Sequence, residues 1–148
     1  MLGFTAFSQG AQGFLFHNAR VDYASLISSD GAYTNCKPQC SFPRGPGDGA
    51  LYLRGPQGPL PSARLEAIRD GLEDYDYLYI AREFVAKVEA KNISTPDLDR
   101  LAGKIRPYFS PGNKLVSSVT KFSQDPAELE EARRLVAGYI VLSRGIQK

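Results

Sequence analysis

The sequence predicts an α/β fold in a helix-rich chain, and two observations support this prediction. Short apolar runs beside glycines occur at residues 13–16 and 50–53, and such runs are typical of strands buried on both faces. Residues 47–83 then have the pattern of a strand, a turn and a long amphipathic helix, which is an α/β unit. The 148 residues are enough for one domain with a hydrophobic core.

The first part of the chain is predicted to hold a helix end, two strands and a long loop. Residues 2–9 are expected to end a helix, with Gly10 as its C-cap glycine. Residues 18–49, between the two apolar runs, have no sustained period, which predicts a loop of about 30 residues. Residues 54–61 contain two Gly-Pro pairs and are predicted to form a turn.

A long helix is predicted from about residue 63 to residue 90, with Ser62 as its N-cap. Its apolar stripe has three- and four-residue spacing: Leu65, Ile68, Leu72, Tyr75 and Tyr79, continued with a small shift in phase by Phe84, Val85 and Val88. Gly71 lies inside this helix, where glycine costs about 1 kcal/mol relative to alanine. We therefore expect another backbone to approach closely at Gly71.

Three further helices are predicted in the last third of the chain. Thr95 and Pro96 begin the first, which has the stripe Leu98, Leu101 and Ile105 and ends at Pro107. A shorter helix is predicted from Asn113 to Phe122. Asp125 and Pro126 begin the last helix as cap and first residue, with Glu128 in its first turn. Its stripe continues through Leu129, Ala132, Val136, Tyr139 and Leu142 or Ser143.

The two predicted strands cannot form a satisfied sheet by themselves. Two strands are marginal in isolation, and parallel strands buried on both faces normally belong to a larger sheet or barrel. We therefore predict a single partial domain over residues 1–148, with the strands and long loop in residues 1–61 and the long and closing helices in residues 62–148.

Composition excludes several classes of partner. A net charge of +2 gives no electrostatic reason to expect nucleic acid or an acidic membrane surface. No apolar run reaches the length of about 18 residues that a membrane span needs, and no signal peptide is expected. We expect no metal and no cofactor, because Cys36 and Cys40 with a single histidine do not make a zinc site. The two cysteines are interpreted as loop thiols or a local disulfide.

Several short motifs follow one another between residues 47 and 78. They are Gly47-Asp48-Gly49, Gly58-Pro59-Leu60-Pro61-Ser62, Arg64-Leu65-Glu66 and Arg69-Asp70-Gly71-Leu72-Glu73-Asp74-Tyr75-Asp76-Tyr77-Leu78. This series resembles the C-terminal part of glycoside hydrolase family 123 and of the related domain of unknown function 4091. Residues 10–16 are similar to the preceding strand of that family, and residues 125–148 to its closing helix.

The resemblance implies a fold, an activity and a partner. The family's catalytic domain is a (β/α)8 TIM-type barrel, and this chain would be its C-terminal part, with the last two strands and the last helix. Such enzymes hydrolyse N-acetylhexosamine linkages, and the acetamido group of the substrate attacks the anomeric carbon beside an acidic pair. That pair lies on an earlier strand without a counterpart here. The resemblance therefore implies no catalytic residue in this chain, and a glycan partner only for a complete barrel.

Four residues are tentative substrate contacts. Residues just past a barrel strand face the active site, which would place Phe16, His17 and Asn18 near a sugar. The family usually has Tyr-Trp where this chain has Phe16 and His17, and Tyr-Pro-Gly where it has Leu53-Arg54-Gly55. His17 is either a sugar contact or proton donor, or a loop histidine without a role. Asp48 either binds a hydroxyl or forms a turn.

The predicted long helix carries many charges, which have two interpretations. Asp70 and Asp74 are four residues apart and share a face, as an acid/base pair could. Arg69 and Glu73 also share a face, which suits an ion pair. We favour structural ion pairs for this set, in which Arg64 is included.

Two hypotheses of function follow. The first is a C-terminal fragment of a family 123-like hydrolase that is inactive alone and associates or dissolves poorly, because its strand edges are exposed. The second is a non-catalytic helical module that binds a carbohydrate or a protein and unfolds cooperatively. A gene remnant without function is a third possibility.

Overall fold

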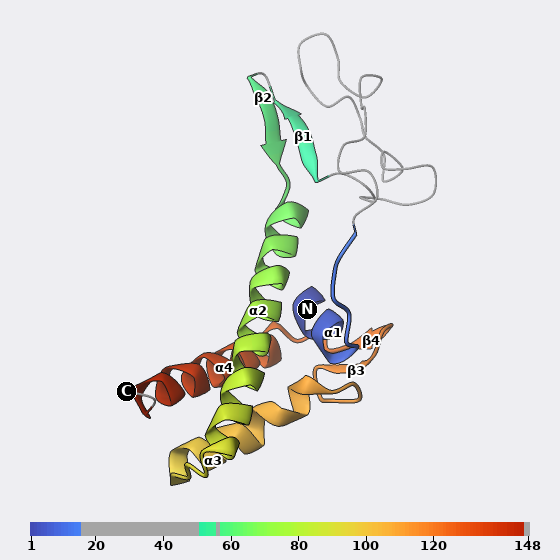
Figure 1. The fold of residues 1–148 in the computed structure, drawn as a ribbon. Coiled ribbons are helices and arrows are strands. Elements are labelled where there is room, and N and C mark those ends of the chain that lie inside the picture. The colour runs from blue at the N-terminus through green and yellow to red at the C-terminus, as the bar shows by residue number, and fades with distance from the viewer. Residues whose placement is uncertain (16–50, 56, 147–148) are drawn as a thin grey trace. The chain divides into compact units, whose positions relative to one another are not determined.

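The computed structural model describes residues 1–15, 51–55 and 57–146 (Figure 1). These residues form four α-helices, one 3-10 helix and two hairpins of two strands each. The chain divides into two compact units, one made of Met1–Phe14 with Asp70–Lys148 and the other of Leu15–Arg69. A helix-rich chain with both helices and strands is therefore confirmed. The predicted loop at residues 18–49, with both cysteines, lies outside the described residues.

The described part of the second unit contains an antiparallel hairpin. β1 (Tyr52–Gly55) overlaps the strand predicted at residues 50–53, but it pairs antiparallel with β2 (Gly58–Pro61). The expectation that residues 54–61 form only a turn is therefore wrong. Gly58 has φ +142°, a conformation that favours glycine, where the chain enters β2.

The prolines of β2 fit this hairpin because of their register. Pro59 lies opposite Arg54, and Pro61 lies opposite Tyr52. The amide of Ser62, one residue further, donates to the carbonyl of Leu51 at 2.9 Å. Hydrogen-bonded and non-bonded pairs alternate along an antiparallel ladder, so both prolines occupy non-bonded positions and no ladder bond is lost.

The longest helix, α2 (Ala63–Ala90), has the predicted bounds. The amide of Leu65 donates to Ser62 Oγ at 3.3 Å, so the predicted N-cap is confirmed. This bond satisfies one of the amides that the first helical turn leaves without a partner.

The first helix, α1 (Leu2–Ser8), ends in the left-handed turn that the sequence predicts. Gly10 has φ +71°, its amide donates to Phe7 O at 3.0 Å, and the amide of Ala11 donates to Ala6 O at 2.9 Å. These two bonds are those of a Schellman motif, in which glycine adopts the left-handed conformation without steric cost.

The strand predicted at residues 13–16 is not formed by its described residues, 13–15. Phe14 is 43 % exposed and Leu15 is 91 % exposed, and neither lies in a strand. A strand needs a neighbour for its backbone hydrogen bonds, and none of the described strands pairs with this segment. The fourth residue, Phe16, lies outside the described residues.

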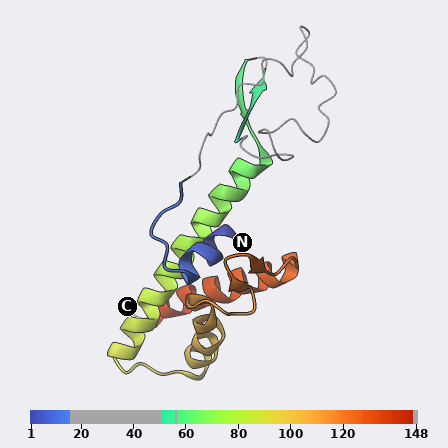
Figure 2. The same cartoon turned by 90° about the vertical axis from the view of Figure 1, so that its right-hand side faces the viewer.

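Two glycines bring α1 and α2 into contact. A Cβ atom on Gly3 would lie 2.0 Å from Gly71 O, and a Cβ on Gly71 would lie 2.9 Å from Leu2 Cβ. Figure 2 shows α1 lying against α2 at this crossing. The close backbone approach expected at Gly71 is confirmed, and it needs a glycine on each helix.

The buried face of α2 differs from the predicted stripe. Leu72 is 49 % exposed and Tyr79 is 48 % exposed, although both belong to the predicted stripe. The buried positions are offset by one residue and alternate three- and four-residue spacing: Gly71, Asp74, Leu78, Ala81, Val85 and Val88. Periodicity missed this face because a glycine, an aspartate and an alanine fill half of it. Val85 and Val88, where the predicted stripe shifts in phase, do lie on the buried face.

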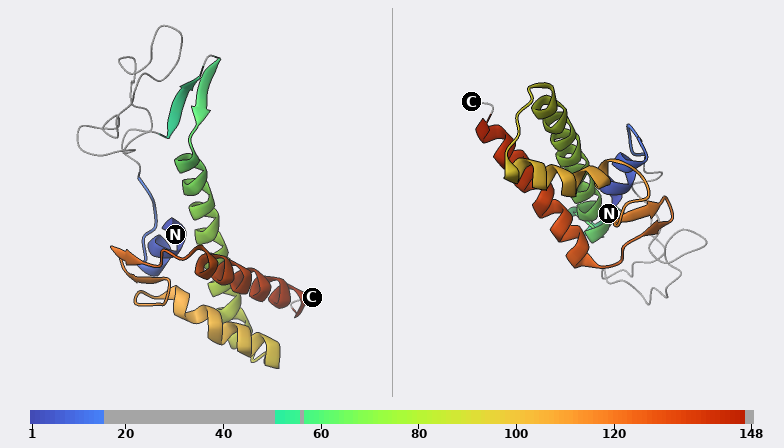
Figure 3. Two further views of the ribbon diagram at one scale, coloured as in Figure 1. Left: turned by 180° about the vertical axis from the view of Figure 1, so that it is seen from behind. Right: turned by 90° about the horizontal axis from the view of Figure 1, so that it is seen from below.

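Two further helices complete the first unit. α3 (Pro96–Ile105) begins at the predicted cap, where the amide of Leu98 donates to Thr95 Oγ1 at 3.3 Å. A 3-10 helix, η2 (Arg106–Phe109), follows it, and α4 (Pro126–Ile146) returns along α3 (Figure 3). The amide of Ala127 donates to Asp125 Oδ1 at 2.9 Å, which confirms the predicted start of α4.

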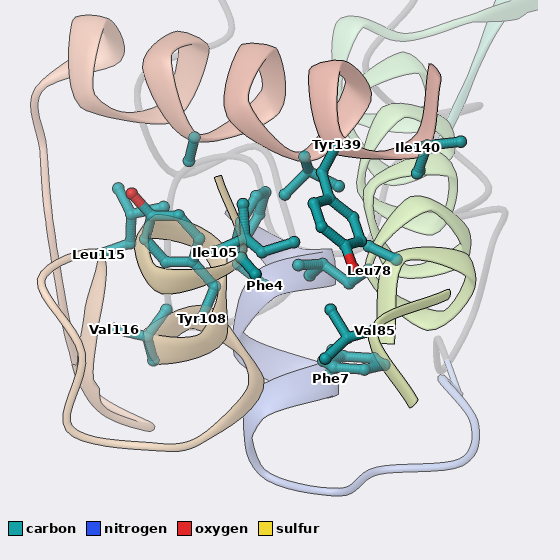
Figure 4. Packing of buried hydrophobic residues seen from close by; sticks show 14 of the residues in the cluster. Phe4, Phe7, Leu78, Val85, Ile105, Tyr108, Leu115, Val116, Tyr139 and Ile140 are labelled. Carbon is teal, nitrogen blue, oxygen red and sulfur yellow. The ribbon is translucent and has the colours of Figure 1, made fainter. Parts of the chain in front are cut away.

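The hydrophobic core of this unit lies between all four helices. Figure 4 shows Phe4 and Phe7 from α1, Leu78 and Val85 from α2, Ile105 from α3, and Tyr139 and Ile140 from α4 converging on it. Phe4 meets the Tyr108 ring edge to face, with the centroids 5.7 Å apart. The predicted stripes of α3 and α4 point into this core, and Leu98, Ile105, Val136 and Tyr139 are almost completely buried.

The short helix predicted at residues 113–122 is wrong, because a second hairpin forms there. β3 (Val116–Ser118) pairs antiparallel with β4 (Lys121–Phe122). The buried Asn113 side chain organises the turn before β3: its Oδ1 accepts from the amides of Leu115 and Val116, both at 2.9 Å. Its Nδ2 donates to Ser110 O at 2.8 Å. These bonds satisfy the backbone locally in a non-helical conformation.

Replacing Asn113 by alanine should cost about 2 kcal/mol of stability, because it leaves two buried amides without an acceptor. Asn113→Asp keeps an acceptor for both amides but sets a carboxylate oxygen against Ser110 O in place of a donor, so it should recover only part of the loss. Denaturant unfolding of the two variants checks this difference. Equal losses would contradict the role of Oδ1.

Candidate functional site

The tentative sugar contacts cannot be placed on the described structure. Phe16, His17, Asn18 and Asp48 all lie outside the described residues. The candidate site is therefore built from the charged residues of α2, which the structure does place.

These charges are distributed along the first half of α2. Arg64 is half-buried in the first turn, and Arg69 forms an ion pair with Glu66 one turn earlier. Asp70, Glu73 and Asp74 line one pocket together. The shared face predicted for Asp70 and Asp74 is thus a wall of this pocket.

The pocket has a volume of about 370 Å³ and lies between α1, α2 and α4. Phe4, Val136 and Ala137 form the apolar part of its lining, and the polar part consists of Asp70, Glu73, Asp74, Tyr77 and Arg133. Three carboxylates face one guanidinium there. The described residues include no group of three or more side chains with the arrangement of a metal site.

Asp74 and Arg133 form the central contact of the pocket. Arg133 Nε lies 2.7 Å from Asp74 Oδ1 and Nη2 lies 2.9 Å from Oδ2, so the guanidinium donates to both carboxylate oxygens. A third bond joins Arg133 Nη1 to Glu130 Oε1 at 2.8 Å. The Asp74 side chain is 6 % exposed and that of Arg133 is 32 % exposed. The pair therefore ties α2 to α4 from the edge of the core.

This geometry decides what Asp74 can do chemically. The hydrogen bonds to Asp74 raise the pKa of Arg133 above its ordinary value, so the guanidinium stays charged at every physiological pH. A bidentate arginine engages both oxygens of a carboxylate and fixes it in one orientation. Asp74 is therefore a structural anion, and the pair of Asp70 with Asp74 does not have the two free carboxyls of a general acid and base.

Arg133 is the residue that sequence reasoning missed. It follows Ala132 on α4 and belongs neither to the apolar stripe nor to an ion pair that the sequence predicts. Its local partner is Glu130, three residues away, whereas Asp74 is 59 positions away in sequence. One sequence signal could have indicated this pair. Asp74 has the same three- and four-residue spacing as Leu78 and Ala81, which predicts that it is buried, and a buried aspartate needs a cationic partner.

A second ionic contact fixes the start of α4. Glu128 Oε1 lies 2.7 Å from Lys114 Nζ, and Ser123 Oγ donates to Glu128 Oε2 at 2.5 Å. These two bonds, that from Lys114 first, lower the pKa of the Glu128 carboxyl below its ordinary value. Ser123 Oγ also accepts from the Asp125 amide at 3.1 Å. The contact thus joins the β4–α4 connection to the loop before β3.

A smaller groove of about 220 Å³ lies beside α1. Its lining is mainly apolar and comes from α1, from residues 11–14 and from α2; it includes Leu2, Ala6, Ala11, Phe14, Leu72 and Tyr75. The Tyr75 hydroxyl donates to Ala11 O at 2.9 Å, and the Tyr75 ring packs edge to face on Phe7. These contacts hold residue 11 against α2.

Fold and site together define a helical packing unit in which Asp74 of the long helix α2 and Arg133 of α4 form a bidentate ion pair. No family model matches the chain, and neither a curated protein nor a solved structure matches it. Among the described helices, none is long and apolar enough to cross a lipid bilayer.

Proposed function

We propose that this chain is the C-terminal portion of a glycoside hydrolase of the family 123 type, and that it is inactive alone. The proposed parent is a (β/α)8 barrel that hydrolyses N-acetylhexosamine linkages in a glycan. In this proposal the chain provides the last two strands and the last helix of the barrel, and the acidic pair comes from elsewhere in the polypeptide.

One observation supports the proposal most directly. The motif that resembles the family, residues 69–78, supplies the main packing contacts of the helical unit: Gly71 receives α1, Asp74 binds Arg133, and Leu78 is fully buried. These roles suit a structural helix that packs against α1 on one side and α4 on the other. The motif is not expected to contain a catalytic group, because its most buried carboxylate, Asp74, is paired with Arg133.

The test is an assay with an aryl N-acetylgalactosaminide. The isolated chain should release no more aryl alcohol than buffer does, and the polypeptide made in its natural host should be longer and should hydrolyse the substrate. Asp70→Asn is the informative variant, since Asp70 lines the pocket without being the partner of Arg133. Hydrolysis by the isolated chain that disappears in Asp70→Asn would sink the proposal. The control is Asp97→Asn, because the Asp97 side chain is exposed on α3 and does not line the pocket.

A non-catalytic binding module is the second candidate. The observation in its favour is that residues 1–14 and 70–148 form a unit with its own hydrophobic core. This candidate expects a monodisperse chain with one cooperative thermal transition, whereas the fragment proposal expects association. A sizing column with a thermal melt separates the two.

A further inference from the structure

The connection between α2 and α3 contains an asparagine in the left-handed backbone conformation (Figure 1). Asn92 has φ +52°, and the other described residues with positive φ are Gly10, Gly58 and Gly112. Asparagine tolerates this conformation better than most side chains, but glycine adopts it without steric cost. The turn therefore permits an asparagine at this position without requiring one.

The turn is held together by its backbone and not by the Asn92 side chain. The Asn92 amide donates to Glu89 O at 2.9 Å, and the Ile93 amide donates to Val88 O at 3.0 Å, which are the two bonds of a Schellman motif. The Ile93 side chain packs against the core, whereas Asn92 is exposed. Its side chain makes no hydrogen bond with any described residue. The Asn92 amide group is therefore presented to solvent from a fixed backbone.

The residues after Asn92 complete a pattern that has a chemical use. Asn92-Ile93-Ser94 is the only place in the sequence where a serine or threonine follows an asparagine by two positions, and the middle residue is not proline. This is the acceptor pattern of N-glycosylation. Thr95, and not Ser94, caps α3, so the helix start does not require the Ser94 hydroxyl. Ser94 Oγ makes an exposed bond to Asp99 Oδ2 at 2.6 Å.

We propose that Asn92 is modified by an N-linked glycan. The donor is an oligosaccharide linked to a lipid through a diphosphate. In the transfer step Asn92 Nδ2 forms a bond to the anomeric carbon of the first sugar, and the bond from this carbon to the diphosphate oxygen breaks. The lipid diphosphate leaves with the electron pair of that bond, and Nδ2 loses one proton to a base of the transferase. The inference goes beyond the proposed function, because here a glycan is attached and not cleaved.

The surroundings of Asn92 suit the modified product. Lys91 and Ser94 are exposed on either side, and Ile93 fixes the turn to the core. A glycan on Asn92 would therefore extend into solvent and leave the packing of α2 and α3 unchanged. The bond from Ser94 to Asp99 does not compete with the transferase, since the transfer takes place on the unfolded chain. The inference requires that the natural polypeptide enters the compartment that holds this transferase.

Mass spectrometry of the polypeptide from its natural host tests the proposal. Trypsin cleaves after Lys91 and Arg100, and Asn92 is the only asparagine in the peptide between them. This peptide should have the added mass of a hexosamine-containing glycan. Peptide N-glycosidase in heavy-oxygen water should convert Asn92 into an aspartate that contains heavy oxygen, and omission of the enzyme should leave no such aspartate. Asn113 is the control: it is buried, lies outside the pattern and should stay unmodified.

Two variants made in the natural host separate the pattern from the turn. Ser94→Ala keeps Asn92 but removes the hydroxyl that the transferase needs, so the glycan should be lost. Ser94→Thr keeps a hydroxyl, so the glycan should remain. Both variants should unfold at nearly the same temperature as the parent without its glycan, because Ser94 is exposed. An unmodified Asn92 in the natural polypeptide would overturn the inference, and so would a glycan that persists in Ser94→Ala.

Discussion

Gly3→Ala is expected to detach α1 from α2 and to lower the stability of the helical unit by about 3 kcal/mol. The new Cβ would lie 2.0 Å from Gly71 O and 2.8 Å from the Tyr75 amide nitrogen. Both are backbone atoms, so a side-chain rotation cannot relieve the clash. Release of α1 instead would expose Phe4 and Phe7, each worth about 2 kcal/mol of burial. Thermal unfolding followed by circular dichroism measures the effect, expected as a fall in Tm of about 10 °C.

The matched control is Gly103→Ala, the same chemical change in α3. Gly103 is exposed, and a Cβ built there meets nothing within 4 Å. Alanine should therefore stabilise the helix by up to about 1 kcal/mol. If both variants shifted Tm in the same direction by similar amounts, the close contact between Gly3 and Gly71 would not be the cause.

Asp74→Asn should cost about 2 to 3 kcal/mol, because it leaves the Arg133 guanidinium beside the core without its ionised partner. We expect a smaller loss of stability than for a fully buried ion pair, because Arg133 is 32 % exposed and keeps its bond to Glu130. The double variant Asp74→Leu with Arg133→Leu should recover most of the stability, because it removes both charges together. A double-mutant cycle measured by denaturant unfolding gives the coupling energy directly.

A surface pair on the same helix provides the control for this cycle. Arg134 and Glu131 are three residues apart on α4 and bond at 2.7 Å, but their side chains are largely exposed. Glu131→Gln should change stability by less than about 0.5 kcal/mol. A coupling energy for Asp74 and Arg133 as small as that of the surface pair would show that burial does not strengthen the contact.

Local signals in the sequence predicted the helix ends well. Gly10, Ser62, Thr95 and Asp125 all occupy the cap positions expected of them. A cap depends on one side chain or one left-handed residue and on amides within three positions, so its chemistry is contained in a short stretch of sequence.

Predictions that required a partner element were less accurate. Apolar periodicity predicts a buried stripe on α2 that includes Leu72 and Tyr79, but both side chains are about half exposed. The buried face of α2 includes Gly71 and Asp74. Gly71 is favourable there because α1 packs against it, and Asp74 is favourable because Arg133 pairs with it. Similarly, residues 113–122 have no strong strand pattern. The hairpin there is stabilised by the Asn113 side chain, which accepts hydrogen bonds from two nearby amides.

By itself, the sequence determined where α2, α3 and α4 begin, where α1 ends, and that another backbone approaches Gly71. Only the tertiary structure decided which face of α2 is buried and that Asp74 belongs to Arg133, 59 residues away. The physical reason is that capping is a short-range hydrogen-bonding property, whereas burial of a glycine or a carboxylate is favourable only when a complementary backbone or cation arrives from a distant part of the chain.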